Sequence, residues 1–218
     1  MSSVASPWKR HHWRGTAGDF HALNPPGERA TWWCDVSQPA LIVGSSQSVD
    51  LISRECADTH HIEVVRRRSG GGLVFVHPSD SVWIDLTMSR GDPLWTDDVT
   101  SSMLWLGDVF VQALSPWISA TTYRNAFVAG EFGRDVCFAS HSPGEVFVGD
   151  HKLVGISQRR TREGARFQCV LYRQWNCDEW LSCVASPHAV AGLQQLRVAT
   201  VDIAAGDIVD AVANALPT

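Results

Sequence analysis

Three consecutive glycines constrain the fold of this chain more than any other feature of its sequence. Gly70, Gly71 and Gly72 separate two apolar, β-like runs at 62–65 and 73–76. Glycine permits backbone conformations and close approaches that a β-carbon would block, and successive N–H groups in such a turn can form a concavity for an anion. The segment lacks the GxxxxGK[ST] pattern, and a strand rather than a helix follows it, so it is neither a Walker loop nor a dinucleotide-binding loop.

Positive charge precedes these glycines in the run Arg66-Arg67-Arg68-Ser69. Arginine suits phosphate or carboxylate because its donors form a planar fork. Side chains alternate along a strand, so Arg67 and Ser69 are expected to face one way and Arg66 and Arg68 the other. The residues alone leave two interpretations open, an anion site and a glycine turn with solvated arginines.

A second candidate lies at Lys152, because Lys9 and Lys152 are the only lysines in 218 residues. Lys152 follows a turn at Gly149-Asp150 and begins a β-like run that continues through Gly155 to Gln158. An ammonium group there could stabilise charge that develops when a carbonyl is attacked, and Gly155 would allow a ligand or a neighbouring chain segment to come close. An exposed strand lysine without a function is the alternative.

Composition excludes several classes of protein. The net charge of −5 argues against a nucleic-acid partner. No apolar run reaches the ~20 residues of a membrane helix, and the N-terminus lacks the apolar segment of a secretory signal. We therefore expect a cytoplasmic protein without a membrane partner. Six cysteines show no CxxC pair and no zinc-ligand spacing, so we expect reduced thiols and no metal site, with Cys177 and Cys183 in the interior of a helix.

Strand and helix signals indicate one α+β domain over 1–218, with strands next to turns and helices inserted between them. Residues 1–31 are expected to form an arm or loop. Helices are expected at 50–59 with Asp50 as N-cap, from Asp97 or Asp98 to Pro116, at 176–184 and at 206–216. Strands are expected at 40–43, 62–65, 73–76, 81–86, 145–148, 152–158 and 167–172.

The two candidate segments together resemble one protein family. Arg66, Arg67, Ser69, Gly70–Gly72 and Val74 match an RRxSGGGxV pattern, and Gly149, Lys152, Gly155 and Gln158 match a later GxKxxGxAQ-like stretch. Ala40–Gln47 is similar to an earlier strand and loop. These stretches resemble the lipoate–protein ligase and octanoyltransferase branch of the biotin/lipoate ligase superfamily, over about residues 32–184.

The resemblance implies a class II synthetase-like fold, a mostly antiparallel sheet flanked by helices. It implies that Lys152 contacts an acyl carbonyl and that Arg67, Ser69 and Gly70–Gly72 line an acyl or nucleotide site, with Gly155, Ser157 and Gln158 beside it. The family histidine lies seven residues after the serine, but here His77 lies eight after Ser69. Either Val76 fills that position or the strand has a bulge. The family's asparagine after this histidine is missing, and Ser157 replaces an alanine.

Three functions remain open at this stage. A lipoate–protein ligase would use ATP and Mg²⁺ to activate lipoate or octanoate as an acyl-adenylate and pass it to a lysine of a carrier domain. An octanoyltransferase would use a thioester and a thiol, for which Cys137 is the candidate because it resembles a cysteine that precedes the lysine hairpin in the family. A non-catalytic acyl- or nucleotide-binding paralogue is the third.

The expected partner is an acidic lipoyl-carrier domain, with Arg159, Arg160, Arg162 and Arg166 as its docking surface. Only 187–218 remains after the resemblance ends, a short C-terminal extension with room for a strand and a helix. We therefore expect no full accessory domain in this chain, so a ligase would work without one or borrow it from another chain.

Overall fold

A computed structural model describes residues 7–25 and 27–218 and contains two β-sheets. The larger has seven strands in the order β1-β2-β6-β10-β9-β8-β7. Their bounds are β1 (Lys9–Gly15), β2 (Ala30–Val36), β6 (Ser81–Ser89), β10 (Gly164–Tyr172), β9 (His151–Arg160), β8 (Val146–Val148) and β7 (Thr121–Thr122). All neighbouring strands are antiparallel except β1 and β2. The expected mostly antiparallel sheet is therefore confirmed.

The smaller sheet has the strand order β4-β3-β5, with β3 (Ala40–Val43) between β4 (Glu63–Arg66) and β5 (Val74–Val76). β3 is parallel to β4 and antiparallel to β5. The glycine segment connects β4 to β5, so it leaves the sheet at one edge and re-enters at the other. It passes the end of β3 closely, because a β-carbon on Gly44 would lie 1.8 Å from the Gly71 carbonyl oxygen.

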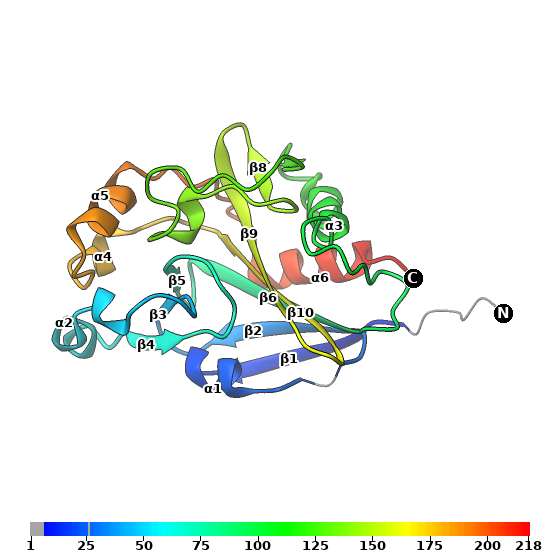
Figure 1. Cartoon of the computed structure of the whole chain (residues 1–218), viewed down its shortest axis with the longest axis horizontal. Helices are drawn as coiled ribbons and strands as arrows, with labels where there is room; N and C mark the ends of the chain where they lie inside the picture. Colours follow the sequence, from blue (N-terminus) through cyan, green and yellow to red (C-terminus); the bar gives the residue numbers. More distant parts are fainter. Residues whose placement is uncertain (1–6, 26) are drawn as a thin grey trace.

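Helices cover both sheets on their outer sides (Figure 1). α3 (Leu104–Leu114) and α6 (Ala205–Ala215) pack together on one face of the large sheet, where Phe110 and Val212 are fully buried against Leu86. α2 (Arg54–Thr59), α4 (Asp178–Leu181) and α5 (Pro187–Gln195) pack against the small sheet around the buried Trp180. The short α1 (Ala17–Ala22) lies beside β4, and two 3₁₀ turns span Val49–Leu51 and Cys137–Ala139.

The alternation of side chains along β6 and β10 separates these layers. On β10, Phe167, Cys169 and Leu171 face α3 and α6 in the main core. The intervening residues Arg166 and Gln168 are buried on the opposite face, towards the small sheet. A strand buried on both sides normally carries apolar residues throughout, so polar residues on one inner face indicate a site between the two sheets.

Several sequence-based boundaries are wrong. Residues 1–31, expected to be an arm, contain β1, α1 and the start of β2 within the described part. Ser53 rather than Asp50 caps α2, because its hydroxyl accepts from the Cys56 N–H at 3.3 Å. α3 begins at Leu104 and not at Asp97 or Asp98, and α4 is shorter than 176–184. Residues 187–218 hold two helices.

Cysteine pairing was also mispredicted. A disulfide joins Cys56 of α2 to Cys183, 127 residues later. Cys183 follows α4 and is therefore not in a helix interior. The pairing could not be read from spacing, because only the packing of α2 against the segment after α4 brings the two residues together. In the described part of the chain, no helix is long and apolar enough to span a membrane.

Candidate acyl-binding and catalytic site

The floor of the site is formed by two rows of side chains that cross β6, β10 and β9. In one row Trp83 pairs with Val170, which pairs with Gly155. In the other, two strand positions further along, Asp85 pairs with Gln168, which pairs with Ser157. Residues two apart on a strand lie on the same face, so both rows face the small sheet. One row gives an apolar surface and the other a polar one.

Arg67 forms the opposite wall and holds the glycine segment in place. Its guanidinium donates to the Gly70 carbonyl at 3.0 Å and to the Gly72 carbonyl at 2.9 Å. Arg67 and Ser69 are buried while Arg66 and Arg68 are exposed, which confirms the expected alternation. Gly71 has a φ of +102°, a conformation that favours glycine. The segment is thus a folded loop rather than a solvated turn.

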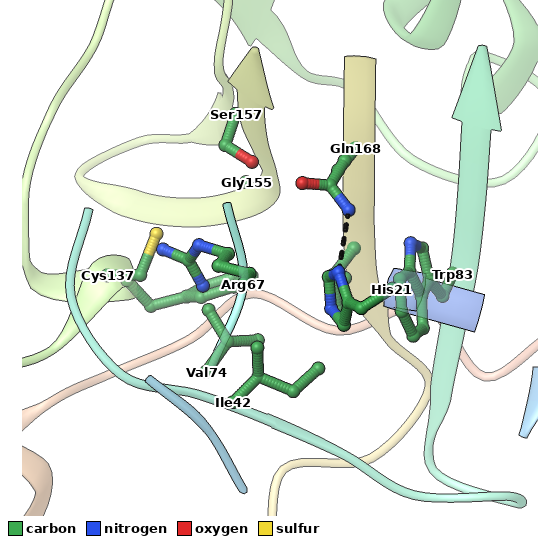
Figure 2. A pocket seen from close by; sticks show the side chains of 11 residues that line it. His21, Ile42, Arg67, Val74, Trp83, Cys137, Gly155, Ser157 and Gln168 are labelled. Atoms are coloured by element: carbon green, nitrogen blue, oxygen red, sulfur yellow. Dashed lines mark hydrogen bonds between the residues drawn. The ribbon is translucent and has the colours of Figure 1, made fainter. Parts of the chain in front are cut away.

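A narrow pocket lies between the floor and this wall (Figure 2). Arg67 and Cys137 are on one side of it, and His21 and Trp83 on the other. Its volume is about 30 Å³, and its lining is mainly apolar; Ile42, Val74, Phe138, Gly155, Ser157, Gln168 and Val170 complete it. The Phe138 ring packs against Gly155, where a β-carbon would lie 3.1 Å from it.

His21 is the least expected residue of this pocket. The Gln168 amide donates to its Nδ1 at 3.4 Å, so Nε2 carries the proton. Burial lowers the pKa of His21 to about 3, with the nearby Arg166 and Arg67 acting in the same direction. His21 is therefore a neutral ring near neutral pH. Its Nε2 is buried without a partner among the described residues.

A wider hollow of about 480 Å³ adjoins the narrow pocket, and Cys137 and Ser157 line both. Gly70, Gly71, Gln158 and Arg160 form part of its wall. The Gln158 amide nitrogen and the Arg160 Nε are buried and have no partner within the described chain. Unpaired buried donors of this kind are rare, and here two of them border one cavity.

Lys152 lies directly behind Cys137 with its side chain fully buried. Its ammonium donates to Glu145 Oε1 and to the Cys137 carbonyl, both at 2.8 Å. Burial raises the pKa of Glu145, while the charge of Lys152 acts in the opposite direction. The rings of Phe138 and Phe147 lie 5.5 and 5.9 Å from the ammonium. Lys152 itself lines neither pocket, but its partner Glu145 lines the wider hollow and Cys137 lines both.

Most of the predicted site residues thus meet in one place. Arg67, Gly70, Gly71, Cys137, Gly155, Ser157 and Gln158 border the two pockets. The Ser69 hydroxyl donates to Gln168 Oε1, in the floor of the site, at 2.8 Å. Gly72 packs so closely against the backbone of 135–137 that a β-carbon on it would not fit. His77 lies apart from them. It follows β5, contacts Ser79 and Asp80, and lines a separate hollow, while Val76 is buried in the core.

Sequence reasoning missed four buried residues and misjudged one. The four missed residues belong to no recognisable motif; they are His21, Trp83, Gln168 and Glu145. Trp83, Gln168 and Glu145 lie in or beside apolar strand runs, where a tryptophan or a polar residue was the only available signal. Arg166, expected on a docking surface, is buried and pairs with Asp85 at 2.6 Å. It cannot form part of that surface, because it lies on the inner face of β10. Arg160 stacks 4.1 Å from the Trp95 ring centre.

The sequence matches the family described as "Lipoyl protein ligase A/B catalytic domain" over residues 21–215. A 58-residue stretch is 34% identical to lipoate–protein ligase 1 of Staphylococcus aureus, which covers 26% of this chain and 18% of that protein.

Solved structures share the fold. Lipoate–protein ligase A bound with ATP superposes with a TM-score of 0.71 at 14% identity, over 97% of this chain and 84% of that one. A Thermoplasma acidophilum protein with bound lipoic acid gives 0.71 at 16% identity, over 96% and 84%. The bi-partite lipoate protein ligase of T. acidophilum, described with its E2 lipoyl domain, gives 0.70 at 15%, over 96% and 82%. The expected α+β ligase fold is therefore confirmed.

Proposed function

Because the chain belongs to the lipoyl protein ligase A/B catalytic domain family, we propose that it attaches a lipoyl or octanoyl group to a lysine of a carrier domain through an acyl-adenylate. The observation that carries this proposal is the junction of a narrow apolar pocket with a wider hollow that contains unpaired buried donors. One cavity suits an acyl chain and the other a polar activating group.

In this proposal the acyl chain enters the narrow pocket along the row Trp83, Val170 and Gly155. The pocket is apolar, and its walls come from strands β3, β5, β6, β9 and β10, with α1, Arg67 and the turn Cys137–Ala139 completing them. Its volume is small for an eight-carbon chain, so binding requires the Phe138 ring to move off Gly155. The carboxyl end of the acid then lies near Cys137 and Ser157, at the junction of the two cavities.

Lys152 is proposed to act on the acyl carbonyl. An ammonium group has three donors, and Glu145 and the Cys137 carbonyl use two of them. A small shift of the turn Cys137–Ala139 would expose the third donor to an acyl oxygen at the junction. Placed there, a fixed positive charge stabilises the oxyanion that forms when the carrier amine attacks the acyl carbonyl and the adenylate leaves.

ATP is proposed to occupy the wider hollow, with Mg²⁺ accompanying its phosphates. The orphaned Gln158 amide and the unpaired Arg160 Nε fit polar acceptor atoms of a nucleotide. Exposed glycine backbone at Gly70 and Gly71 could approach a phosphate closely. The similar structures that contain ATP or lipoic acid support this pairing of ligands.

The proposed protein partner is a small lipoyl-carrier domain, as the archaeal relative with its E2 lipoyl domain suggests. The cations available to it are the exposed Arg68 and Arg162 and the half-buried Arg159. Arg159 lies near Arg68, and burial lowers its pKa, with the charge of Arg68 adding to the effect. An acidic carrier surface would relieve that repulsion. An accessory ligase domain supplied by another chain, and a cytoplasmic location, remain part of this proposal.

A second function is supported by the position of Cys137. The residue is half-buried and lines both cavities, so an acyl thioester in the narrow pocket would reach its thiol. In an ATP-independent octanoyltransferase, the Cys137 sulfur would attack the thioester carbonyl, release the donor thiol and pass the acyl group to the carrier lysine.

One assay separates the alternatives. The chain is incubated with an apo lipoyl domain and either octanoate with ATP and Mg²⁺ or an octanoyl thioester, and the mass of the domain is followed. Transfer only with ATP supports the ligase, with Cys137→Ser keeping activity. Transfer only from the thioester, lost in Cys137→Ser, supports the transferase instead. The matched control is Cys177→Ser, because Cys177 is a free, half-buried cysteine that lines neither cavity.

A further inference from the structure

The two cysteines of the disulfide have a third potential metal ligand beside them. His60 Nδ1 lies 3.6 Å from the Cys56 sulfur and 3.9 Å from the Cys183 sulfur. Cys56 and His60 are four residues apart on and just after α2, so they share one side of the helix. These are the ligand types that Zn²⁺ and other thiophilic cations prefer.

The observed separations agree with tetrahedral coordination. With bonds of about 2.3 Å to sulfur and about 2.05 Å to nitrogen, two ligands of a tetrahedral zinc ion lie about 3.6 Å apart for S···N. The measured 3.6 and 3.9 Å agree with this value. Around zinc the two sulfurs would lie about 3.8 Å apart, against about 2.05 Å in a disulfide. The two sulfurs must therefore move apart when the cation binds.

The backbone around the site holds the two segments together independently of the disulfide. The Ser53 N–H donates to the Cys183 carbonyl at 2.8 Å, and the Ala185 N–H donates to the Leu51 carbonyl at 2.8 Å. Ile52 and Val184 form an antiparallel bridge between these bonds. After reduction the two thiols would therefore remain neighbours. A site preorganised in this way loses little conformational entropy when a cation binds.

The surroundings favour positive charge and offer a further ligand. His60 and Ser182 line a hollow of about 530 Å³, together with the carboxylates of Asp178 and Glu179. The Ser182 hydroxyl is 3.6 Å from the Cys56 sulfur. This hollow shares no lining residue with the two cavities of the acyl site. A function here is therefore separate from acyl transfer.

We propose that the reduced chain binds one thiophilic divalent cation, of the Zn²⁺ type, through the thiolates of Cys56 and Cys183 and Nδ1 of His60. The fourth position is filled from the hollow, by water or a carboxylate. The disulfide is the oxidised form, which cannot hold the cation because its sulfurs have no free thiolate charge. The protein then carries a metal site that a change of redox state opens and closes.

A dithiol reductant gives two electrons and two protons to the Cys56–Cys183 bond, becomes a disulfide itself and leaves two thiols on the chain. Cation binding then displaces the two thiol protons to solvent. In the disulfide form His60 Nδ1 contacts the Cys56 carbonyl at 2.9 Å, as a donor. When Nδ1 binds the cation, the ring proton moves to Nε2.

The test uses the full chain and Co²⁺ as the probe. The chain is reduced with a dithiol, freed of it by anaerobic desalting, and titrated with Co²⁺ while the thiolate-to-cobalt charge-transfer absorption is recorded. We expect saturation at one Co²⁺ per chain, displacement by Zn²⁺, and no such band from the unreduced chain. Absence of the band from the reduced chain would overturn the proposal.

Variants identify the ligands. Cys56→Ser should abolish the band, and His60→Ala, at an exposed position, should weaken Co²⁺ binding more than tenfold. Cys177→Ser, which removes a thiol outside the cluster, should change neither. A normal band in Cys56→Ser refutes the site. If Cys56→Ser does not fold, His60→Ala decides, because unchanged affinity there excludes the proposed ligand set.

Discussion

Replacing Lys152 with methionine tests the buried ion pair that anchors the site. Methionine has nearly the length of lysine and fills the same space, so the change removes charge with little loss of packing. It leaves Glu145 with backbone donors alone, the Ser142 N–H, which donates to its other oxygen at 2.7 Å, and the Ile156 N–H. It also removes the donor that the Cys137 carbonyl accepts from at 2.8 Å.

The expected loss of stability follows from these two orphaned groups. Breaking a buried ion pair by removing one partner costs about 3–5 kcal/mol. At roughly 2–4 °C per kcal/mol for a chain of this size, the melting temperature should fall by about 6–20 °C. The double variant Glu145→Gln/Lys152→Met removes the unpaired charge, and its glutamine oxygen can still accept from Ser142. We expect it to recover about 2 kcal/mol of the loss, with about 1–3 kcal/mol still lost at the Cys137 carbonyl.

The loss should depend on pH. Burial raises the pKa of Glu145 even with Lys152 present, and without the lysine it rises further. Between its unfolded pKa near 4.5 and this higher folded value, the folded state binds more protons, so stability falls as pH rises. Lys152→Met should therefore be closest to the wild type near pH 5 and furthest from it near pH 8.

The measurement is urea unfolding of the wild type, both single variants and the double variant at pH 5 and pH 8. Equal stability of Lys152→Met and wild type at pH 8 would refute the buried pair, as would additive effects of the two single changes. Acyl transfer separates structure from chemistry. The double variant should fold yet remain inactive, whereas restored transfer would show that Lys152 has only a structural role.

Three further predictions concern the pockets. When the pH falls from 7 to 5, the wild type should lose about 2 kcal/mol of unfolding free energy relative to His21→Gln. The reason is that the folded His21, with a pKa of about 3, stays neutral while the ring in the unfolded chain takes a proton. Urea midpoints of the two proteins that differ by the same amount at both pH values would contradict this. Gly71→Ala should lower the free energy of unfolding by about 1–2 kcal/mol and weaken acyl binding in calorimetry, since its φ is +102° and a β-carbon would lie 2.7 Å from the Arg67 guanidinium. Gly91→Ala, with open space around it and outside both cavities, is the control and should change little. Arg166→Met should lower the free energy of unfolding, measured in urea, by about 3–5 kcal/mol, because it leaves Asp85 buried without its partner. A decrease below 1 kcal/mol would show that Asp85 is already protonated in the wild type.

Local patterns predicted the elements that are regular and apolar. The runs at 40–43, 73–76 and 81–86 are strands, and the periodic segment at 206–216 is α6. Glycines in the loop and the near-unique lysine marked the two segments that meet at the site. These features depend on neighbours in sequence, so sequence alone was sufficient to find them.

Long-range pairing determined the features that were missed. β1 is a strand because it pairs in parallel with β2, not because of its own residues, which include two histidines and two arginines. His21 reaches the pocket from α1, where it contacts Gln168, 147 residues later in the chain. Arg166 reads as a surface cation until Asp85, 81 residues earlier, is placed beside it on the inner face of the sheet.

The two bonds from Arg67 to the Gly70 and Gly72 carbonyls have a consequence for how a ligand would bind. A run of three glycines is ordinarily the most disordered kind of loop, because glycine loses more conformational entropy on folding than any other residue. Here a buried side chain of the same segment has already fixed the loop's shape, so that entropy is lost during folding rather than during recognition. Binding affinity can then come from contacts with the ligand itself. An Arg67→Lys chain would keep the charge and still forfeit this preorganisation, because a single ammonium lacks the planar fork.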